Sequence, residues 1–262
     1  VAQASSDRNL RVAVMGRVKA GKSTLLNALF GRTVAATHAF EQSAAIHEVA
    51  AISEDHAEWG RLVRVGDQAE ELTPEGLADV CAEHRGDAAF WTDVERLETK
   101  VRADHMPQTM TFFDTPGVGA LSVDNVSRTN DFLDGAHVVL WVQSGQGLGN
   151  AEDKRFLDEL VRRGRRVVPV VTRADLLDED EQADAMRWFG RTFPALPTPI
   201  MTHAPGWGPP PDEAARHGLL EALAAGNAAD GGDRNAAAAQ SLRLDLEGAA
   251  TGEQADIDRL CA

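Results

Sequence analysis

A glycine-rich stretch near the start of the chain has the residue types and spacing of a phosphate-binding loop. Gly16 is followed, after four intervening residues, by Gly21, Lys22 and Ser23. Glycines let backbone N–H groups curl around phosphate oxygens, a lysine at this position reaches the β- and γ-phosphates, and the serine hydroxyl can ligate Mg²⁺. The same pattern also occurs in glycine-rich turns, so the flanking elements decide its meaning.

The residues on both sides of this loop predict the elements that hold it. The stretch 12–15 is an unbroken apolar run, which is typical of a strand buried on both faces of a parallel sheet. Leu25, Leu26 and Leu29 repeat at helical spacing, and Gly31 is the expected C-terminal stop of that helix. A strand, the loop and a helix in this order favour a phosphate site.

A second candidate motif is the sequence Asp-Thr-Pro-Gly over 114–117. It follows an expected buried strand over 109–113. At such a strand end, Asp114 can hold Mg²⁺ through water and the Gly117 N–H can contact the γ-phosphate. Taken alone, the same four residues also form a common turn. Because they occur in the same chain as the phosphate-loop motif, we favour a nucleotide-binding role over a simple turn.

A third group, Thr172 to Asp175, follows an expected strand over 166–171. The Asp175 carboxylate can accept hydrogen bonds from the guanine N1–H and exocyclic amine, groups that adenine lacks, and the Arg173 cation can stack on the base. The alternative is that Asp175 caps the next helix.

Strands and helices alternate along the chain, which predicts an α/β fold with a mainly parallel, doubly wound sheet and flanking helices. We expect Thr73 to cap a helix that begins at Pro74, and residues 33–45 to form a mobile loop. The other expected strands cover residues 46–52, 61–65, 95–102, 137–143 and 198–202, and the other expected helices cover 124–134, 151–163, 179–190 and 212–225.

Composition limits the setting of this chain. The 26 basic and 41 acidic residues give a net charge of −15, which opposes non-specific attraction to nucleic acid, so we expect no nucleic-acid partner. Two cysteines, Cys81 and Cys261, cannot form a disulfide framework and indicate a reducing compartment. The apolar runs are too short to span a bilayer. Because the chain begins at Val1 without a methionine, we expect a processed or excised piece.

The three motifs, in this order, resemble the guanine-nucleotide motifs of TRAFAC-class GTPases, which are P-loop NTPases. The long interval between the first two motifs, together with residues 20–31 and 114–180, resembles the GTPase domain of bacterial dynamin-like proteins over residues 10–204. This resemblance implies a P-loop NTPase fold with an insertion between the first switch, the loop expected over 33–45, and the Asp-Thr-Pro-Gly motif.

The resemblance also implies an activity and partners. The chain is expected to bind GTP and GDP, to hydrolyse GTP to GDP and phosphate with Mg²⁺, and to self-associate across its nucleotide face. Nucleotide-dependent dimerisation would drive membrane remodelling in the full-length protein, which would be cytoplasmic and peripheral to the membrane, with membrane contact only through regions outside this chain. The expected organisation is a flexible N-terminus over 1–9, a GTPase domain over 10–225, a linker over 226–235 and a helical segment of a stalk or bundle over 236–262.

Family roles are carried over residue by residue. The resemblance implies catalytic roles for Lys19, Lys22, Ser43 and Gly117, Mg²⁺ ligation by Ser23, Ser43 and Asp114, and nucleotide contacts from Gly16, Lys19, Ala20, Gly21, Lys22, Ser23, Thr24, Asp114, Gly117, Thr172, Arg173, Asp175, His203 and Ala204.

Several positions depart from the family pattern. Arg173 replaces a lysine, which keeps the charge but alters the reach. Ser43 stands at the first-switch threonine position, with Thr37 as the alternative, and Val118 stands where Ras-like proteins have a water-orienting glutamine. Lys19 replaces the usual serine near the place where several related GTPases hold a monovalent cation. Its ammonium could neutralise the same developing charge, or it could point to solvent.

Two other functions stay open. An Era-like ribosome-assembly GTPase would need an RNA-binding module, for which the acidic charge gives no support. A non-hydrolysing, nucleotide-gated scaffold would bind nucleotide without turnover.

Overall fold

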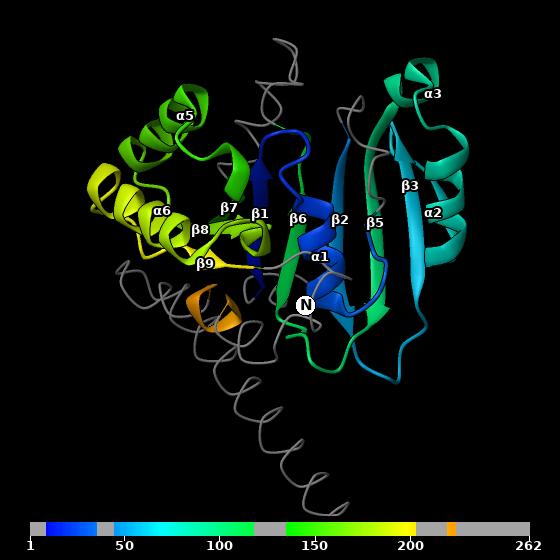
Figure 1. Ribbon diagram of the computed structural model, residues 1–262. Helices are drawn as coiled ribbons and strands as arrows, with labels where there is room; N and C mark the ends of the chain where they lie inside the picture. Colours follow the sequence, from blue (N-terminus) through cyan, green and yellow to red (C-terminus); the bar gives the residue numbers. More distant parts are fainter. Residues whose placement is uncertain (1–8, 36–44, 118–134, 203–218, 224–262) are drawn as a thin grey trace, which may run out of the picture.

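The structure is a computed structural model that describes residues 9–35, 45–117, 135–202 and 219–223. The described residues form one nine-stranded sheet with helices on both faces (Figure 1). The strands are β1 (Leu10–Gly16), β2 (Ile46–Ile52), β3 (Trp59–Arg64), β4 (Gln68–Leu72), β5 (Val94–Arg102), β6 (Met110–Asp114), β7 (Val138–Ser144), β8 (Val167–Thr172) and β9 (Ile200–Met201). The helices are α1 (Lys22–Phe30), α2 (Pro74–Glu83), α3 (Ala88–Thr92), α5 (Ala151–Arg162) and α6 (Glu179–Thr192).

The strand order is β4-β3-β5-β2-β6-β1-β7-β8-β9. From β6 to β9 every neighbouring pair is parallel, and β2 is also parallel to β5. The antiparallel pairs are β2 with β6, β3 with β5 and β3 with β4. The sheet is therefore mainly parallel, as predicted, and the carboxyl ends of β1, β6, β7 and β8 meet at one edge.

Three apolar clusters hold the layers together. The largest joins α1 to one face of β1, β6, β7 and β8, and a second joins α5 and α6 to the opposite face. The third and smallest joins α2 and α3 to β3 and β5 at the other end of the sheet (Figure 1). This arrangement confirms the predicted doubly wound α/β fold of the P-loop NTPase class.

Local capping follows the sequence where the signals are strong. Thr73 caps α2 by accepting a hydrogen bond from the Gly76 N–H at 3.0 Å, and Pro74 is the first helical residue. Gly31 ends α1 with φ of 67°, a left-handed conformation that favours glycine.

The inserted region between β2 and β6 differs most from the prediction. It contains β3, β4, α2, α3 and β5. Sequence reasoning missed β4 and α3 and placed β3 at 61–65. β4 is a largely exposed edge strand with two adjacent glutamates, so it lacks the apolar alternation that marks a strand. α3 has five residues, too few to show a period.

Several expectations fall outside the described residues. These are residues 1–8 of the flexible N-terminus expected over 1–9, most of the mobile loop over 33–45, the helix over 124–134, the linker and the C-terminal helical segment. Of the helix expected over 212–225, residues 219–223 are described and helical. Within the described residues, no helix has the length and apolar character needed to cross a membrane.

Candidate functional site

The loop between β1 and α1 begins with a glycine that no other residue could replace. A Cβ at Gly16, whose φ is 152°, would lie 2.0 Å from the Val142 carbonyl oxygen of β7. Gly21 caps α1 with φ of 95° and no capping side chain, so the first amides of α1 are left for a ligand. Ala20 is buried in the same loop, and Thr24 lies in the first turn of α1.

Lys22 folds back into the loop. Its ammonium donates hydrogen bonds to the carbonyl oxygens of Gly16 at 3.2 Å and Arg17 at 3.0 Å. The side chain is buried, so its charge is concentrated where the loop amides converge. A phosphate group entering the loop would meet this cation.

Ser23 and Asp114 join the first helix to the end of β6. The Ser23 hydroxyl donates to the Asp114 Oδ2 atom at 2.6 Å. Asp114 is only 3% exposed, and its Oδ1 atom has no hydrogen-bond partner among the described residues. Burial raises the pKa of this carboxyl, against the opposing effects of Lys22 and the Ser23 hydrogen bond. A serine hydroxyl beside a half-satisfied buried carboxylate is a donor set that fits Mg²⁺.

Two threonines fix the loops around this point. The Thr172 hydroxyl donates to the Ala20 carbonyl oxygen at 2.6 Å and lies 3.2 Å from that of Gln143. The Thr115 hydroxyl donates to the Val14 carbonyl oxygen at 2.9 Å. Thr172, which the sequence assigned to nucleotide contact, therefore holds the phosphate loop with its side chain.

The turn after β8 presents the other two residues of the third motif. Arg173 has φ of 56° and Asp175 lies in the 3₁₀ turn Ala174–Leu176, with both side chains exposed. Asp178 caps α6 by accepting from the Glu181 N–H at 2.8 Å, so the alternative that Asp175 caps this helix is wrong.

The chain that leaves β9 starts beside the same turn. The Thr202 carbonyl oxygen accepts a hydrogen bond from the Ala174 N–H at 3.0 Å. His203 and Ala204, the expected base contacts that follow, lie outside the described residues.

Gly117 lies against the phosphate loop. A Cβ at this position would be 2.6 Å from the Val18 backbone nitrogen, so the close approach requires glycine. Its expected neighbours in catalysis, Ser43 or Thr37 and the position of Val118, lie outside the described residues.

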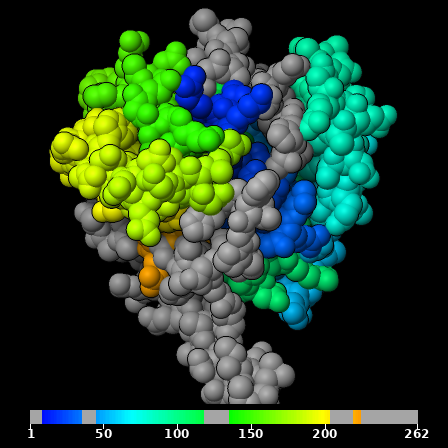
Figure 2. Space-filling view, in the orientation of Figure 1, coloured from blue at the N-terminus to red at the C-terminus, as the bar shows by residue number. Residues whose placement is uncertain are grey.

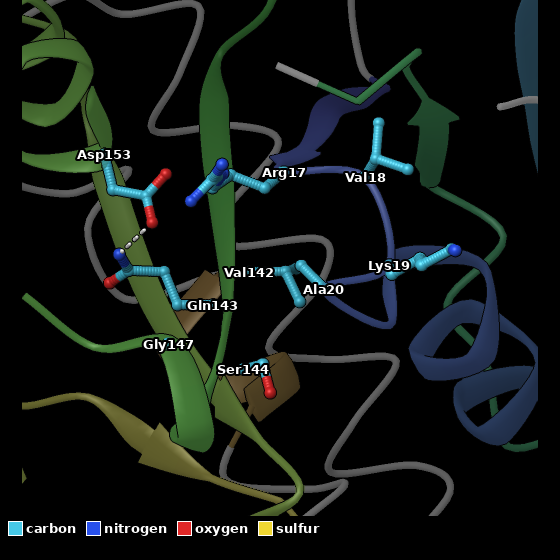
Figure 3. Close-up of a pocket in the computed structure, with 9 residues that line it drawn as sticks. All are labelled: Arg17, Val18, Lys19, Ala20, Val142, Gln143, Ser144, Gly147 and Asp153. Atoms are coloured by element: carbon cyan, nitrogen blue, oxygen red, sulfur yellow. Dashed lines mark hydrogen bonds between the residues drawn. The ribbon is translucent and has the colours of Figure 1, made fainter. Parts of the chain in front are cut away.

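Lys19 is exposed in the middle of the loop and has φ of 65°. This left-handed conformation is unfavourable for a residue with a side chain. In Figure 3 the Lys19 side chain points toward α1 and away from Gln143 and Asp153.

A cavity of about 300 Å³ lies between the phosphate loop and the start of α5 (Figure 3). On its wall, the Gln143 Nε2 atom donates to the Asp153 Oδ2 atom at 3.1 Å. Burial raises the pKa of Asp153, and its Oδ1 atom and Gln143 Oε1 have no partner among the described residues. The remaining lining residues are Arg17, Val18, Lys19, Ala20, Val142, Ser144 and Gly147.

Sequence reasoning missed this cavity. The sequence near the cavity offers one pattern, Asn150 followed three positions later by Asp153 in the first turn of α5. This pattern is typical of ordinary helix capping and does not indicate a cavity. Figure 2 shows the dark blue surface near the loop meeting the green surface of the α5 region.

Two proteins are similar to parts of this chain in sequence. An uncharacterised protein from the xynA 3′ region of Caldicellulosiruptor sp. is 24% identical over 170 residues, which are 65% of this chain and 41% of that protein. An uncharacterised protein of Acinetobacter baylyi is 32% identical over 74 residues, which are 28% of this chain and 14% of that protein. The chain thus spans less than half the length of these relatives.

Solved structures share the fold. Two structures of an oligomerised bacterial dynamin pair, described as sensing and tethering membranes, give TM-scores of 0.61 and 0.62 at 18% identity. Each covers 91% of this chain, which spans 37% of those chains.

The sequence model of the dynamin family matches residues 12–174. This match spans more than half of the chain and includes the phosphate loop, the Ser23–Asp114 contact and Thr172. The chain therefore belongs to the dynamin family.

Proposed function

We propose that this chain binds GTP with Mg²⁺ and hydrolyses it to GDP and phosphate, as the nucleotide-dependent domain of a longer protein. The observation that carries the proposal is the Ser23–Asp114 contact of 2.6 Å below the phosphate loop, with one oxygen of the buried carboxylate left without a partner. A buried carboxylate in this state is costly unless a ligand compensates it.

The chain's own residues divide the work. The loop amides and Lys22 bind the phosphates, and Lys22 exchanges two backbone carbonyls for phosphate oxygens. Ser23, Asp114 and Ser43, with Thr37 as the alternative to Ser43, would hold Mg²⁺, which supplies charge neutralisation on the phosphates when bound. Gly117 lies close to Val18 of the phosphate loop, and its N–H would contact the γ-phosphate.

Base recognition belongs to the turn after β8. Asp175 accepts the guanine N–H groups, Arg173 stacks on the base, and His203 and Ala204 contribute backbone contacts. Thr172 ties this turn to the loop, so that base and phosphates are held at a fixed separation.

Self-association completes the site. Position 118 is a valine and the stretch 33–46 contains no arginine, so one copy lacks a water-orienting glutamine or a first-switch arginine. We therefore expect pairing across the nucleotide faces of two copies. In the longer protein this pairing would drive membrane remodelling from the cytoplasmic side, with membrane contact only through regions outside this chain.

Nucleotide binding with and without Mg²⁺ tests the core of the proposal. Fluorescent GDP and a GTP analogue should bind in Mg²⁺ and weaken about tenfold or more in EDTA or in Ser23→Ala, because both remove the metal contact. Ser53→Ala, a serine substitution in the loop between β2 and β3, should match the wild type. Equal binding in EDTA, or in Ser23→Ala, would contradict the proposal.

Phosphate release over a range of protein concentrations tests turnover and pairing together. Specific activity should rise over a hundredfold concentration range, with a dimer in light scattering when a transition-state mimic is bound. Binding with no turnover under any condition would favour the scaffold alternative. A flat specific activity without a dimer would call for a different activator.

A further inference from the structure

Residues 34 and 35, at the start of the first switch, are buried against the core rather than loosely attached. Ala35 is fully buried and Val34 is 6% exposed, and both belong to the apolar cluster that contains α1 and β6. Buried backbone N–H and C=O groups need hydrogen-bond partners. Residues 33–35 form no helix or strand that could supply them.

One side chain supplies these partners. The Asn27 Oδ1 atom accepts hydrogen bonds from the Val34 and Ala35 N–H groups, each at 2.8 Å. The Asn27 Nδ2 atom donates to the Ala35 carbonyl oxygen at 2.9 Å. Only an amide offers an acceptor and a donor in this shape, since an ionised aspartate cannot donate and a leucine can do neither.

Asn27 lies on the helix that also carries the phosphate and metal contacts. It follows Ser23 by four positions in α1, so the two side chains share a helix face and are separated by about 6 Å along the axis. Ser23 in turn contacts Asp114. A single short helix therefore fixes both the Ser23–Asp114 pair and residues 34–35.

The inserted region holds the same segment from the other side. Arg32 pairs with Glu58 at 2.6 Å and with Glu75 at 3.0 Å. These ion pairs are partly exposed, so they contribute less than the hydrogen bonds of Asn27.

We propose that Asn27 is a positioning residue for nucleotide recognition. By holding residues 34 and 35 to α1, it sets where the following chain starts relative to the phosphate loop, and it thereby sets the preference for a nucleoside triphosphate over a diphosphate. This inference rests on the proposed function. If Asn27 has this role, its loss should weaken binding of the triphosphate more than binding of the diphosphate. An asparagine that only stabilised the fold would not change this ratio.

The test measures affinity for GDP and for a non-hydrolysable GTP analogue, together with kcat and Tm, in the whole chain. Asn27→Ala should weaken the analogue about tenfold and lower kcat about as much, while GDP affinity stays within about twofold. Asn27→Asp keeps the two acceptor contacts and loses the donor, so its effect should be smaller, about threefold.

Two matched variants separate positioning from stability. Leu29→Ala, in the buried face of the same helix, should lower Tm without changing the ratio of the two affinities. Arg32→Met should change that ratio less than Asn27→Ala does. Each variant is compared at a temperature where circular dichroism reports it folded.

The outcomes are distinct. Wild type that binds neither nucleotide would overturn the proposed function. Amide exchange would then test the anchor, since Val34 and Ala35 should lose protection in Asn27→Ala and keep it in Leu29→Ala. Wild type that binds, with Asn27→Ala changing only Tm and leaving the affinity ratio at the wild-type value, would overturn the positioning role alone.

Discussion

Two buried carboxylates lie on β5 and β6, the strands on either side of β2, and have different surroundings. Glu98 of β5, in the inserted region, is 9% exposed and accepts from Arg96 Nε at 2.7 Å and Arg61 Nη1 at 3.4 Å. Asp114 of β6 is 3% exposed and accepts one hydrogen bond among the described residues, from the Ser23 hydroxyl. Glu98 is thus held by two arginines, whereas one oxygen of Asp114 has no hydrogen-bond partner among the described residues.

Strained backbone conformations also differ between the nucleotide site and the inserted region. Among the described residues other than glycine, Lys19, Arg173 and Asp67 have positive φ. Asp67 lies in the tight turn between β3 and β4, where aspartate tolerates this conformation. Lys19 and Arg173 lie at the proposed nucleotide end, where each costs of order 1 kcal/mol. A half-satisfied carboxylate and two strained residues therefore lie where a ligand could compensate them, whereas Glu98 of the inserted region is paired with two arginines.

The strongest test of this comparison replaces each carboxylate by its amide. Asp114→Asn should weaken Mg²⁺-dependent nucleotide binding by about a thousandfold, because the metal loses a charged partner. Since burial raises the pKa of Asp114, its charged form destabilises the nucleotide-free fold above pH 4, and the amide should raise Tm in the absence of nucleotide.

Glu98→Gln should lower stability and leave nucleotide binding intact. It weakens two arginine contacts, so we expect a loss of about 1–2 kcal/mol in urea unfolding, with nucleotide affinity unchanged. If both amides changed stability and binding in the same direction, the distinction between the two carboxylates would fail.

The next largest effect concerns guanine selection. Asp175→Ala should remove about 3 kcal/mol of preference for guanine, or roughly a hundredfold, because the base loses its paired acceptor. Competition of ATP and GTP against a labelled nucleotide measures it, with Asp180→Ala in α6 as the exposed control. Wild type from which ATP displaces the label as well as GTP does would contradict the assignment.

The nucleotide end was largely predictable because its signals are local. A buried strand, a glycine-rich loop and an amphipathic helix occupy adjacent residues, and Asp114 directly follows an apolar run. Their spacing fixed the parallel core around β1 and the order of the three motifs. The dynamin-family match confirms the resemblance drawn from the same residues.

The remaining features depend on contacts that a sequence pattern does not encode. Asn27 occupies a polar position in α1 that could equally face solvent, and only tertiary packing brings Val34 and Ala35 to it. Gln143 and Asp153 meet across a strand end and a helix start. The β4 edge strand has too many charged residues to be recognised by alternation.

His47 lies in β2, the strand between Glu98 on β5 and Asp114 on β6, and its expected effect on stability is of intermediate size. It lies in β2 opposite Asp114 in the strand register, and its Nε2 atom is 2.7 Å from the Thr99 hydroxyl. Complete burial lowers the pKa of His47 to about 4. Below the ordinary pKa of about 6.5 the unfolded chain takes up a proton that the folded chain refuses, so stability falls as the pH drops.

Between pH 7.5 and 5 this residue should account for a loss of about 2 kcal/mol in the free energy of unfolding. Urea unfolding across that range measures it, and His47→Gln should flatten the dependence by the same amount. An unchanged slope in His47→Gln would assign the acid sensitivity to other groups.

The smallest expected effect concerns Lys19, which is exposed on the loop and strained at φ of 65°. If its ammonium replaces a monovalent cation beside the phosphates, wild-type hydrolysis should not change when K⁺ is exchanged for a large organic cation. Lys19→Ser should turn over about threefold to tenfold more slowly and recover in K⁺, because the free ion restores the lost charge. Comparing Lys19→Ser with Lys19→Gly separates charge from conformation, since both remove the ammonium but only glycine also relieves the positive φ. Lys19→Gly should therefore be at least as stable as the wild type, and its hydrolysis should depend on K⁺ as much as that of Lys19→Ser. A wild type that requires K⁺, or a Lys19→Ser variant with an unchanged rate, would leave Lys19 as a solvent-facing residue and remove it from the catalytic set.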